Sequence, residues 1–383
     1  MTTAARVLER CDELGAISEE PGRLVRRFAT PAMREAHALV AGWMREAGLE
    51  VREDAVGNLI GRRGTGRVLA LGSHCDTVID AGRYDGPLGV IAAIAIAERL
   101  PGAPLEVISF ADEEGVRYGT AFLGSSAVAG TFDREQLSWE DADGVPMRDL
   151  VGDPAAAARD DVAAYVELHI EQGPVLERAG VPVGVVTTIT GQTHVEVAFT
   201  GEAGHAGTVP MDARRDALAA ASELVLAAEA LARGRDRLVA TVGKIAADPG
   251  ARNVIPGRAA LSLDVRHVDD AARRAAVEDL RGEAERIAGE RGVGLAWEPR
   301  GETEAVPADP ELLRRLEQAI GTDAVRLPSG AGHDGVAMSA IAPVAMLFVR
   351  CERGVSHNPA EAVAEADVAV ALDVLERFVA GFA

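Results

Sequence analysis

The chain has 383 residues, a formal net charge of −21, a hydrophobic content of 48% and three cysteines. This apolar content is enough to build large cores, which excludes a chain that is disordered throughout, and the negative charge argues against a nucleic-acid partner. An odd number of cysteines does not suggest a disulfide framework and favours a cytoplasmic protein with reduced thiols.

The amino-terminal region is predicted to be helical. Two periodic segments within residues 1–47 are separated by a break at residues 20–22, which read Glu-Pro-Gly. Charges occur within the first ten residues and no continuous apolar stretch follows them, so we expect no targeting segment. The most apolar run, residues 90–97, is too short to span a bilayer, so we expect no membrane partner.

Strands and helices then alternate. We expect strands at residues 50–52, 58–62, 67–72 and 105–110, and a buried helix at residues 87–100. This alternation predicts an α/β domain with a mostly parallel sheet covered by helices. Ligand sites in such sheets lie at the carboxyl ends of the strands, where His74 and Glu113 fall.

A second pattern begins near residue 190. Its predicted order is β-α-β-β-α-β, the signature of a split βαβ (ferredoxin-like) unit, with elements at residues 192–200, 214–233, 238–245, 259–266, 271–290 and 294–298. Helix and buried strand then resume, including a strand at residues 343–349. We therefore predict a discontinuous catalytic domain, residues 1–190 and 301–383, interrupted by an inserted α+β domain, residues 191–300. Residues 149–161 are predicted to form a mobile surface loop.

The first cluster of chemically capable residues is GSHCDTV, followed by GRYDGPLGV. Positions two apart in an extended segment share a face, so His74 and Asp76 can point the same way, as in a carboxylate that orients a metal-bound imidazole. Asp85 can coordinate a metal and bridge two, although it can equally cap the helix predicted after it. Cys75 is expected to face away from His74 and to be buried.

The second cluster is FADEEGVRYG, in which Glu113 and Glu114 follow a buried strand. Two adjacent carboxylates are costly there unless a cation compensates or one is protonated. A metal site would use one as a ligand and the other as a general base toward water. The alternative is an exposed acidic loop.

Two further histidines are candidates: His169 ends an apolar run in ELHIEQGP, and His357 lies in a turn sequence, GVSHNPAE, after the last buried strand. Taken singly, His169 can be a core residue and His357 part of a surface turn. Together the four clusters provide imidazoles and carboxylates without thiolates at the ends of strands in one sheet. Such a donor set suits a two-metal hydrolytic site holding Zn²⁺ or Mn²⁺.

Ten segments carry a resemblance to a known family, and they occur in the order GSHCDTV, GRYDGPLGV, EEGVRYG, GSSAVAG, LHIEQGPVLE, GEAGHAGTVPM, NVIPG, DVRH, SGAGHD and GVSHNPAE. From about Arg23 to the last helix, the chain resembles the allantoate amidohydrolase and N-carbamoyl-L-amino acid amidohydrolase (hydantoinase–carbamoylase) family. These are dinuclear metallohydrolases of the aminoacylase–carboxypeptidase type.

The resemblance implies roles for the clustered residues. Two divalent metal ions per subunit, Zn or Mn, would be held by His74, Asp85, Glu114, His169 and His357, with Asp85 bridging. Glu113 would be the general base that activates water, and Asp76 would orient His74. His169 stands where related peptidases carry an acidic ligand, which favours ureido amide chemistry over peptide cleavage.

The resemblance also assigns the substrate residues and the oligomer. His205 would stabilise the oxyanion, Asn253 would bind substrate, and Arg266 would clamp its carboxylate. Gln172 and the 329–333 loop, with Ser329, Gly330 and His333, would line the pocket. The insert would act as lid and form a homodimer, and His205 and Asn253 can reach the partner's active site.

The expected reaction is hydrolysis of the terminal ureido C–N bond of a small carboxylate, which releases ammonia and CO₂. Allantoate is the first substrate, because DVRH, SGAGHD and SHNPAE are nearer to the allantoate enzymes. N-carbamoyl-L-amino acids come second, then β-ureidopropionate or ureidoglycolate. The rival is a metallopeptidase or N-acyl amino acid deacylase on the same scaffold.

Overall fold

The computed structural model describes residues 2–321 and 323–382, and the predicted domain ends at residues 1 and 383 lie outside these ranges, as does residue 322. The chain divides into two compact units, which are Met1–Ile189 with Ala308–Ala383 (unit 1) and Thr190–Pro307 (unit 2).

The main sheet carries the candidate site. In the described chain its strands are β1 (Glu50–Glu53), β2 (Leu59–Arg63), β3 (Val68–His74), β4 (Leu105–Phe110), β5 (Val162–Ile170), β6 (Val183–Ile189), β13 (Val306–Pro307), β14 (Val325–Ser329) and β15 (Val344–Val349). Their order is β1-β2-β4-β3-β5-β15-β6-β13, and β14 pairs with β6. β3 is parallel to β4 and β5, and β5 is parallel to β15, so four neighbouring strands end at the same edge.

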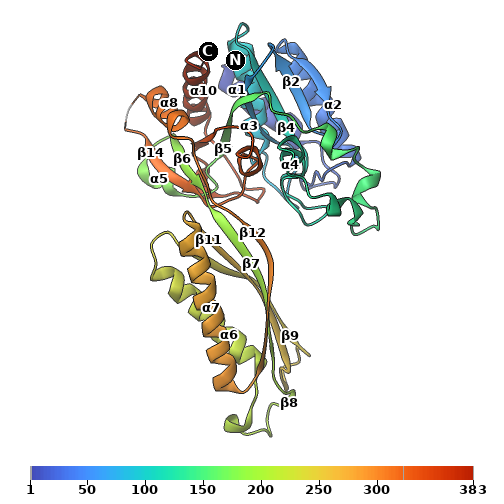
Figure 1. Ribbon diagram of the computed structural model, residues 1–383, viewed down its shortest axis with the longest axis vertical. Coiled ribbons are helices and arrows are strands. Elements are labelled where there is room, and N and C mark those ends of the chain that lie inside the picture. Colours follow the sequence, from blue (N-terminus) through green and yellow to red (C-terminus); the bar gives the residue numbers. More distant parts are fainter. Residues whose placement is uncertain (1, 322, 383) are drawn as a thin grey trace. The chain divides into compact units, whose positions relative to one another are not determined.

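Helices cover this sheet (Figure 1). They are α1 (Thr3–Gly15), α2 (Pro31–Glu46), α3 (Pro87–Arg99), α4 (Leu123–Val128), α5 (Val175–Ala179), α8 (Pro310–Ile320), α9 (Gly335–Met338) and α10 (Glu365–Ala380). α3 packs on β3, β4 and β5, and α1 and α10 pack on α3. The first eleven residues of α3 are buried, as its uniformly apolar sequence predicts.

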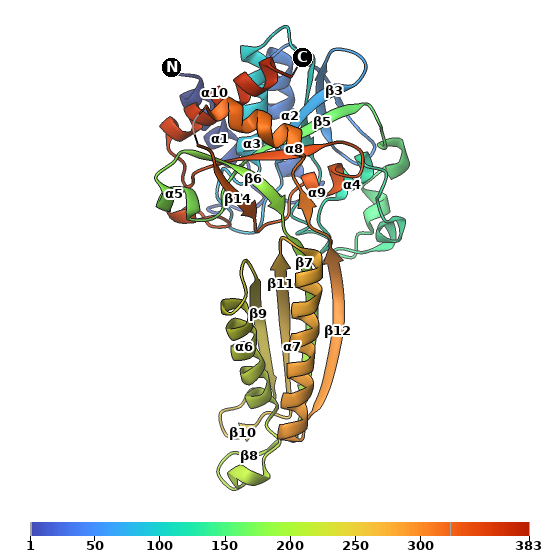
Figure 2. The ribbon, with the colours of Figure 1, turned by 60° about the vertical axis from the view of Figure 1, so that its left-hand side comes forward.

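Unit 2 is built on a four-stranded antiparallel sheet of order β12-β7-β11-β9. Its elements are β7 (Gly191–Thr200), β8 (Gly204–His205), α6 (Ala217–Arg233), β9 (Val239–Asp248), β10 (Val254–Ile255), β11 (Arg258–His267), α7 (Asp270–Arg291) and β12 (Gly294–Thr303). β11 lies between β7 and β9, which gives the split βαβ arrangement, and α6 and α7 lie side by side on one face (Figure 2). The predicted fold class, a mostly parallel α/β sheet with a separate α+β unit, is confirmed.

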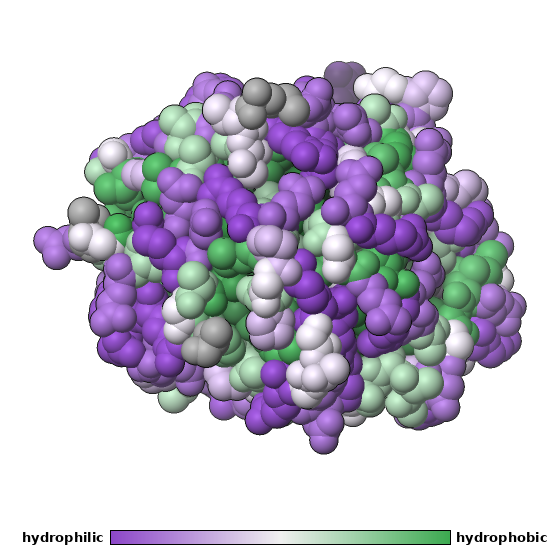
Figure 3. All heavy atoms as spheres, turned by 90° about the horizontal axis from the view of Figure 1, so that it is seen from above, coloured by the Kyte–Doolittle hydropathy of each residue, from purple (hydrophilic) through white to green (hydrophobic). Residues whose placement is uncertain are grey.

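The surface agrees with the composition. One face of the molecule is mostly hydrophilic, with small, scattered hydrophobic patches (Figure 3). Among the described residues, the helices are too short or too polar for any of them to cross a membrane.

Candidate metal centre

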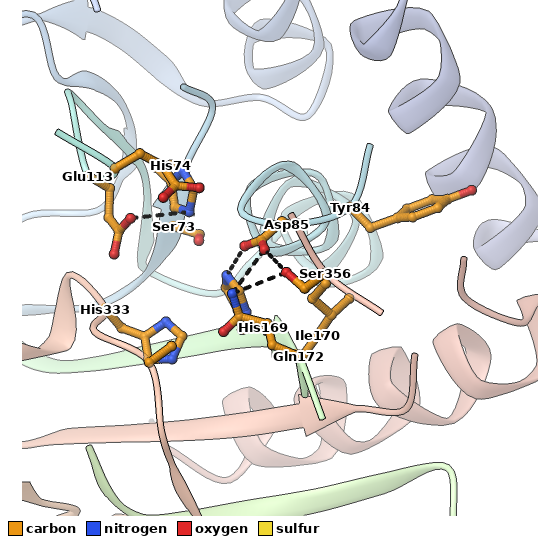
Figure 4. Close-up of polar contacts among 12 residues, drawn as sticks. Ser73, His74, Tyr84, Asp85, Glu113, His169, Ile170, Gln172, His333 and Ser356 are labelled. Atoms are coloured by element: carbon orange, nitrogen blue, oxygen red, sulfur yellow. Dashed lines mark hydrogen bonds and ion pairs between the residues drawn. The ribbon is translucent and has the colours of Figure 1, made fainter. Parts of the chain in front are cut away.

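The predicted ligands meet at the carboxyl edge of the main sheet, and Figure 4 shows His74, Asp85 and His169 among them, with Glu113 beside His74. His74 is the last residue of β3, and His169 is the last but one of β5. Glu113 and Glu114 follow β4, and His357 lies in the segment after β15. Because β4, β3, β5 and β15 are parallel to one another, residues far apart in the chain converge at their carboxyl ends.

One group consists of His74, Asp85 and His169, whose ligand atoms lie within 4.8 Å of one another. All three residues are buried, and His169 Nε2 lies 3.1 Å from Asp85 Oδ1. The Nδ1 atoms face main-chain carbonyls, of Asp76 at 3.0 Å for His74 and of Ile170 at 2.9 Å for His169. A carbonyl at Nδ1 fixes the tautomer with its proton there, which leaves Nε2 of each ring free to bind a metal.

A second group consists of Asp85, Glu114 and His357. His357 Nε2 lies 3.3 Å from Asp85 Oδ2 and 3.5 Å from Glu114 Oε1. The His357 side chain is 49% exposed, so this group opens toward solvent while the first is enclosed. Asp85 belongs to both groups and presents one oxygen to each, as a bridging ligand must.

Asp85 does not cap the helix that follows it. The N-cap of α3 is Gly86, and no side chain caps that end of the helix, so the capping alternative is wrong. The Asp85 carboxylate instead accepts hydrogen bonds from Gln172 Nε2, at 2.9 Å, and from Ser356 Oγ. Ser356 was not predicted from the sequence, although its position directly before His357 was an available signal.

Glu113 and Glu114 do not form an exposed acidic loop. Glu113 is 7% exposed and its Oε2 lies 3.7 Å from His74 Nε2, so the exposed-loop alternative is wrong. The Asp76 carboxylate accepts the main-chain N–H groups of Glu113 at 3.2 Å and Glu114 at 3.0 Å. Asp76 therefore contacts His74 through its carbonyl and orders the Glu113–Glu114 turn through its carboxylate.

Burial and like charges shift the pKa values in this cluster. Burial, reinforced by Glu114, raises the pKa of Glu113 well above its ordinary value. Burial, with Asp85 and Asp76, raises the pKa of Glu114 to about 9. Burial alone would raise the pKa of Asp85, but the imidazoles of His169, His74 and His357 outweigh it and lower that pKa. The metal-free cluster therefore holds protons that divalent cations would displace.

The spacing of the donor atoms fits metal ions. Ligands bound tetrahedrally at about 2.1 Å stand roughly 3.4 Å apart, and the imidazole–carboxylate separations in the two groups are 3.1, 3.3 and 3.5 Å. His169 Nε2 is also buried without a hydrogen bond. An oxygen and nitrogen donor set of this kind can hold divalent cations at both groups.

Glu167, His169 and His333 form a further cluster beneath these groups. The Glu167 carboxylate already accepts hydrogen bonds from Ser73 Oγ at 2.8 Å and Tyr165 Oη at 3.0 Å. His333 Nε2 lies 2.7 Å from the hydroxyl of Ser329, and its ring contacts that of His169, with centroids 4.6 Å apart. Through these contacts the cluster holds the His169 ring in position. They also place Ser329 and His333 beside the site, and Gly330 is the next residue after Ser329 in the chain.

Three predicted residues belong to unit 2. β8, with His205, pairs with β10, which directly follows Asn253, and the Ala206 N–H donates to the Asn253 carbonyl at 3.0 Å. β11 begins at Arg258, shortly after β10, and Arg266 lies eight residues further along this strand. Eight strand residues span about 26 Å, so unit 2 carries the pair His205 and Asn253 at one end and Arg266 toward the other.

Replacing Gly86 by Ala is expected to damage the first group. Gly86 has φ +84°, and a Cβ there would lie 2.4 Å from His74 Cε1 and 2.5 Å from its Nε2. We expect metal affinity to fall at least about 10-fold, measured by equilibrium dialysis with Mn²⁺. Gly22→Ala is the matched control, because Gly22 has the same φ and nothing within 4 Å. Equal metal affinity in the two variants would contradict this steric account.

Comparisons with known proteins add to this geometry. The family model described as Peptidase family M20/M25/M40 matches residues 70–381. The chain is 39% identical to the allantoate deiminase of Arabidopsis thaliana, over 96% of this chain and 80% of that protein. It is 42% identical to the N-carbamoyl-L-amino acid amidohydrolase of Geobacillus stearothermophilus, over 98% of this chain and 97% of that protein. The crystal structure of an amidase of the hydantoinase/carbamoylase family from Burkholderia multivorans matches with a TM-score of 0.90 at 34% identity, over 98% of this chain and 97% of that chain.

Proposed function

This chain belongs to Peptidase family M20/M25/M40, in its hydantoinase/carbamoylase group, and from that premise we propose that it is an allantoate amidohydrolase. It is a hydrolase of ureido C–N bonds, and the proposed reaction converts the terminal ureido group of allantoate and one water into ammonia, CO₂ and the freed amine. The observation that carries the proposal is Asp85, shared between two ligand groups beside a buried Glu113.

Different residues of the chain would bind the metal ions and transfer the proton. His74, Asp85 and His169 would hold one ion, and Asp85, Glu114 and His357 a second, either Zn²⁺ or Mn²⁺. Bound divalent ions supply Lewis acidity toward the ureido carbonyl and lower the pKa of water. Glu113 takes the proton from the attacking water and returns it to the leaving nitrogen.

We further propose a homodimer formed through unit 2. His205, in the separate β8–β10 pair, and Asn253, directly before β10, lie near the start of β11, whereas Arg266 lies toward the end of β11, which supports their serving different active sites. In this arrangement His205 of one subunit donates a hydrogen bond to the oxyanion formed at the other subunit's site.

Arg266→Ala is expected to weaken substrate binding. The Arg266 guanidinium donates from Nη2 to Asp264 Oδ2 at 2.6 Å, which limits its orientation, and in the proposed function it would clamp the substrate carboxylate. Losing a charge-assisted hydrogen bond of this kind should raise KM about 10- to 100-fold with a smaller change in kcat, measured by steady-state ammonia release. Arg258→Ala, at the exposed start of the same strand, is the control. A change in kcat alone would remove Arg266 from the substrate clamp.

Ammonia release tests the function as a whole. The chelated protein, and the same protein restored with Mn²⁺, are each offered allantoate and N-carbamoyl-L-amino acids. We expect release from allantoate only in the restored sample. Release confined to N-carbamoyl-L-amino acids would favour the second candidate, which the 42% identity to the Geobacillus enzyme supports. No ammonia from these two substrates, nor from β-ureidopropionate and ureidoglycolate, with metal bound would refute ureido hydrolysis.

A further inference from the structure

Three residues of the segment between β15 and α10 contact Asp85, which belongs to both ligand groups. His357 faces the Asp85 carboxylate, and Ser356 donates a hydrogen bond to it. The third contact is to the main chain: Glu361 Oε1 accepts the N–H of Tyr84 at 2.7 Å and that of Asp85 at 3.1 Å. Glu361 is 6% exposed, so water does not readily replace it as the acceptor.

We propose that Glu361 is a positioning residue that fixes the backbone at Asp85, and so sets the bridging carboxylate between the two ligand groups. The inference rests on the proposed function only in taking these groups to bind metal ions. Glu361 is absent from the candidate ligand groups found among the described residues. Its effect on a metal must therefore pass through Asp85.

The local chain explains why such a support is needed. Asp85 lies between the end of β3 and the start of α3, and the residue after it, Gly86, adopts φ +84°. No side chain caps α3 at this end. The Tyr84 and Asp85 N–H groups precede the helix and have no carbonyl partner within it, so Glu361 supplies the acceptor that holds them in one orientation.

The space around the Glu361 side chain is filled by its neighbours. A Cβ at Gly82 would lie 2.4 Å from Glu361 Cβ, Cδ and Oε1, so only a glycine lets the turn approach this side chain so closely. Glu361 Oε2 is buried without a hydrogen bond. The contacts of the Glu361 carboxylate therefore indicate one role, which is to accept hydrogen bonds from the Tyr84 and Asp85 N–H groups through Oε1.

The test uses the full chain with two substitutions at Glu361. Glu361→Ala removes the acceptor, whereas Glu361→Gln keeps a carbonyl oxygen and loses the charge. Glu352→Ala, an exposed glutamate of the same segment, is the control. Two readouts are needed: amide hydrogen exchange of residues 82–86 in the metal-free protein, and Mn²⁺ affinity by equilibrium dialysis.

We expect Glu361→Ala to speed exchange at residues 82–86 at least about 10-fold and to weaken Mn²⁺ binding about 10- to 100-fold. Glu361→Gln and Glu352→Ala should stay within about threefold of the unmodified chain in both readouts. Unchanged exchange in Glu361→Ala would overturn the proposal, as would equal losses in the Ala and Gln variants.

Two further measurements cover the cases in which a variant does not fold or the chain binds no Mn²⁺. If Glu361→Ala does not fold, Gly82→Ala takes its place, because the added methyl must displace the same side chain, and unchanged exchange there would overturn the proposal equally. If the unmodified chain binds no Mn²⁺, the proposed metal function fails, and exchange in the metal-free protein still decides whether Glu361 holds Asp85.

Discussion

Replacing Glu113 by Gln should lower kcat about 100- to 10,000-fold, the usual contribution of a general base, while the protein keeps its metal content. Gln preserves the size of the side chain and removes its capacity to take a proton. Glu113 is buried beside His74, and the Asp76 carboxylate holds its backbone, so the substitution should leave the surrounding geometry in place. Steady-state kinetics with metal analysis of the same sample make the measurement.

The neighbouring carboxylate provides the control for that experiment. Glu113 also belongs to a possible ligand group with His74 and Glu114, so the same loss of activity could arise from loss of a metal. Glu114→Gln should lower both the metal content and the activity, since Glu114 faces His357 in the solvent-facing group. A fall in the metal content of Glu113→Gln to the level of Glu114→Gln would make Glu113 a ligand.

Replacing Asp85 by Ala should have the largest effect on metal binding. Its two carboxylate oxygens face His169 and His357, one in each ligand group. Removing it takes a ligand from both sites and leaves the buried imidazoles without their counter-charge. We expect the content to fall from about two ions to below about one per chain, and turnover to fall to that of the chelated protein. Metal analysis by mass spectrometry after dialysis provides the measurement.

His357→Ala is the informative partner of that variant. His357 belongs to the solvent-facing group alone, so its loss should remove about one ion and leave the buried group loaded. Equal metal contents in Asp85→Ala and His357→Ala would show that Asp85 does not bridge. Asp85 is buried and accepts hydrogen bonds from Gln172 and Ser356, whereas the His357 side chain is 49% exposed, so the metal-free Asp85→Ala protein should be the less stable of the two in thermal unfolding.

Much of the fold followed from hydrophobic pattern. The apolar run in α3 and the alternation in β7 and β11 predicted a buried helix and half-buried strands, and the structure has them at nearly the predicted bounds. The histidines and acids at strand ends were found because residues of this chemistry seldom follow buried strands without a use. The family resemblance carried by the ten segments is also confirmed.

The remainder depended on contacts between residues distant in sequence. Pattern alone left Asp85 as either a cap or a ligand, and only its approach to His169 and His357 removes the first possibility. Ser356 and Glu361 resemble ordinary polar loop residues, because their partner is more than 270 positions away. Likewise, no periodicity could show that Arg266 lies far along the sheet from His205.

The bridging carboxylate has a consequence for how the protein is made. Asp85 is translated early, but His357, Ser356 and Glu361 follow only after β15, with the whole of unit 2 translated in between. A nascent chain that has emerged as far as β5 thus carries His74, Asp85 and His169, the whole of the first ligand group, whereas the second group lacks His357. In the proposed two-metal site, the second ion could therefore be captured only at the end of biogenesis, after the segment that follows β15 has joined the sheet.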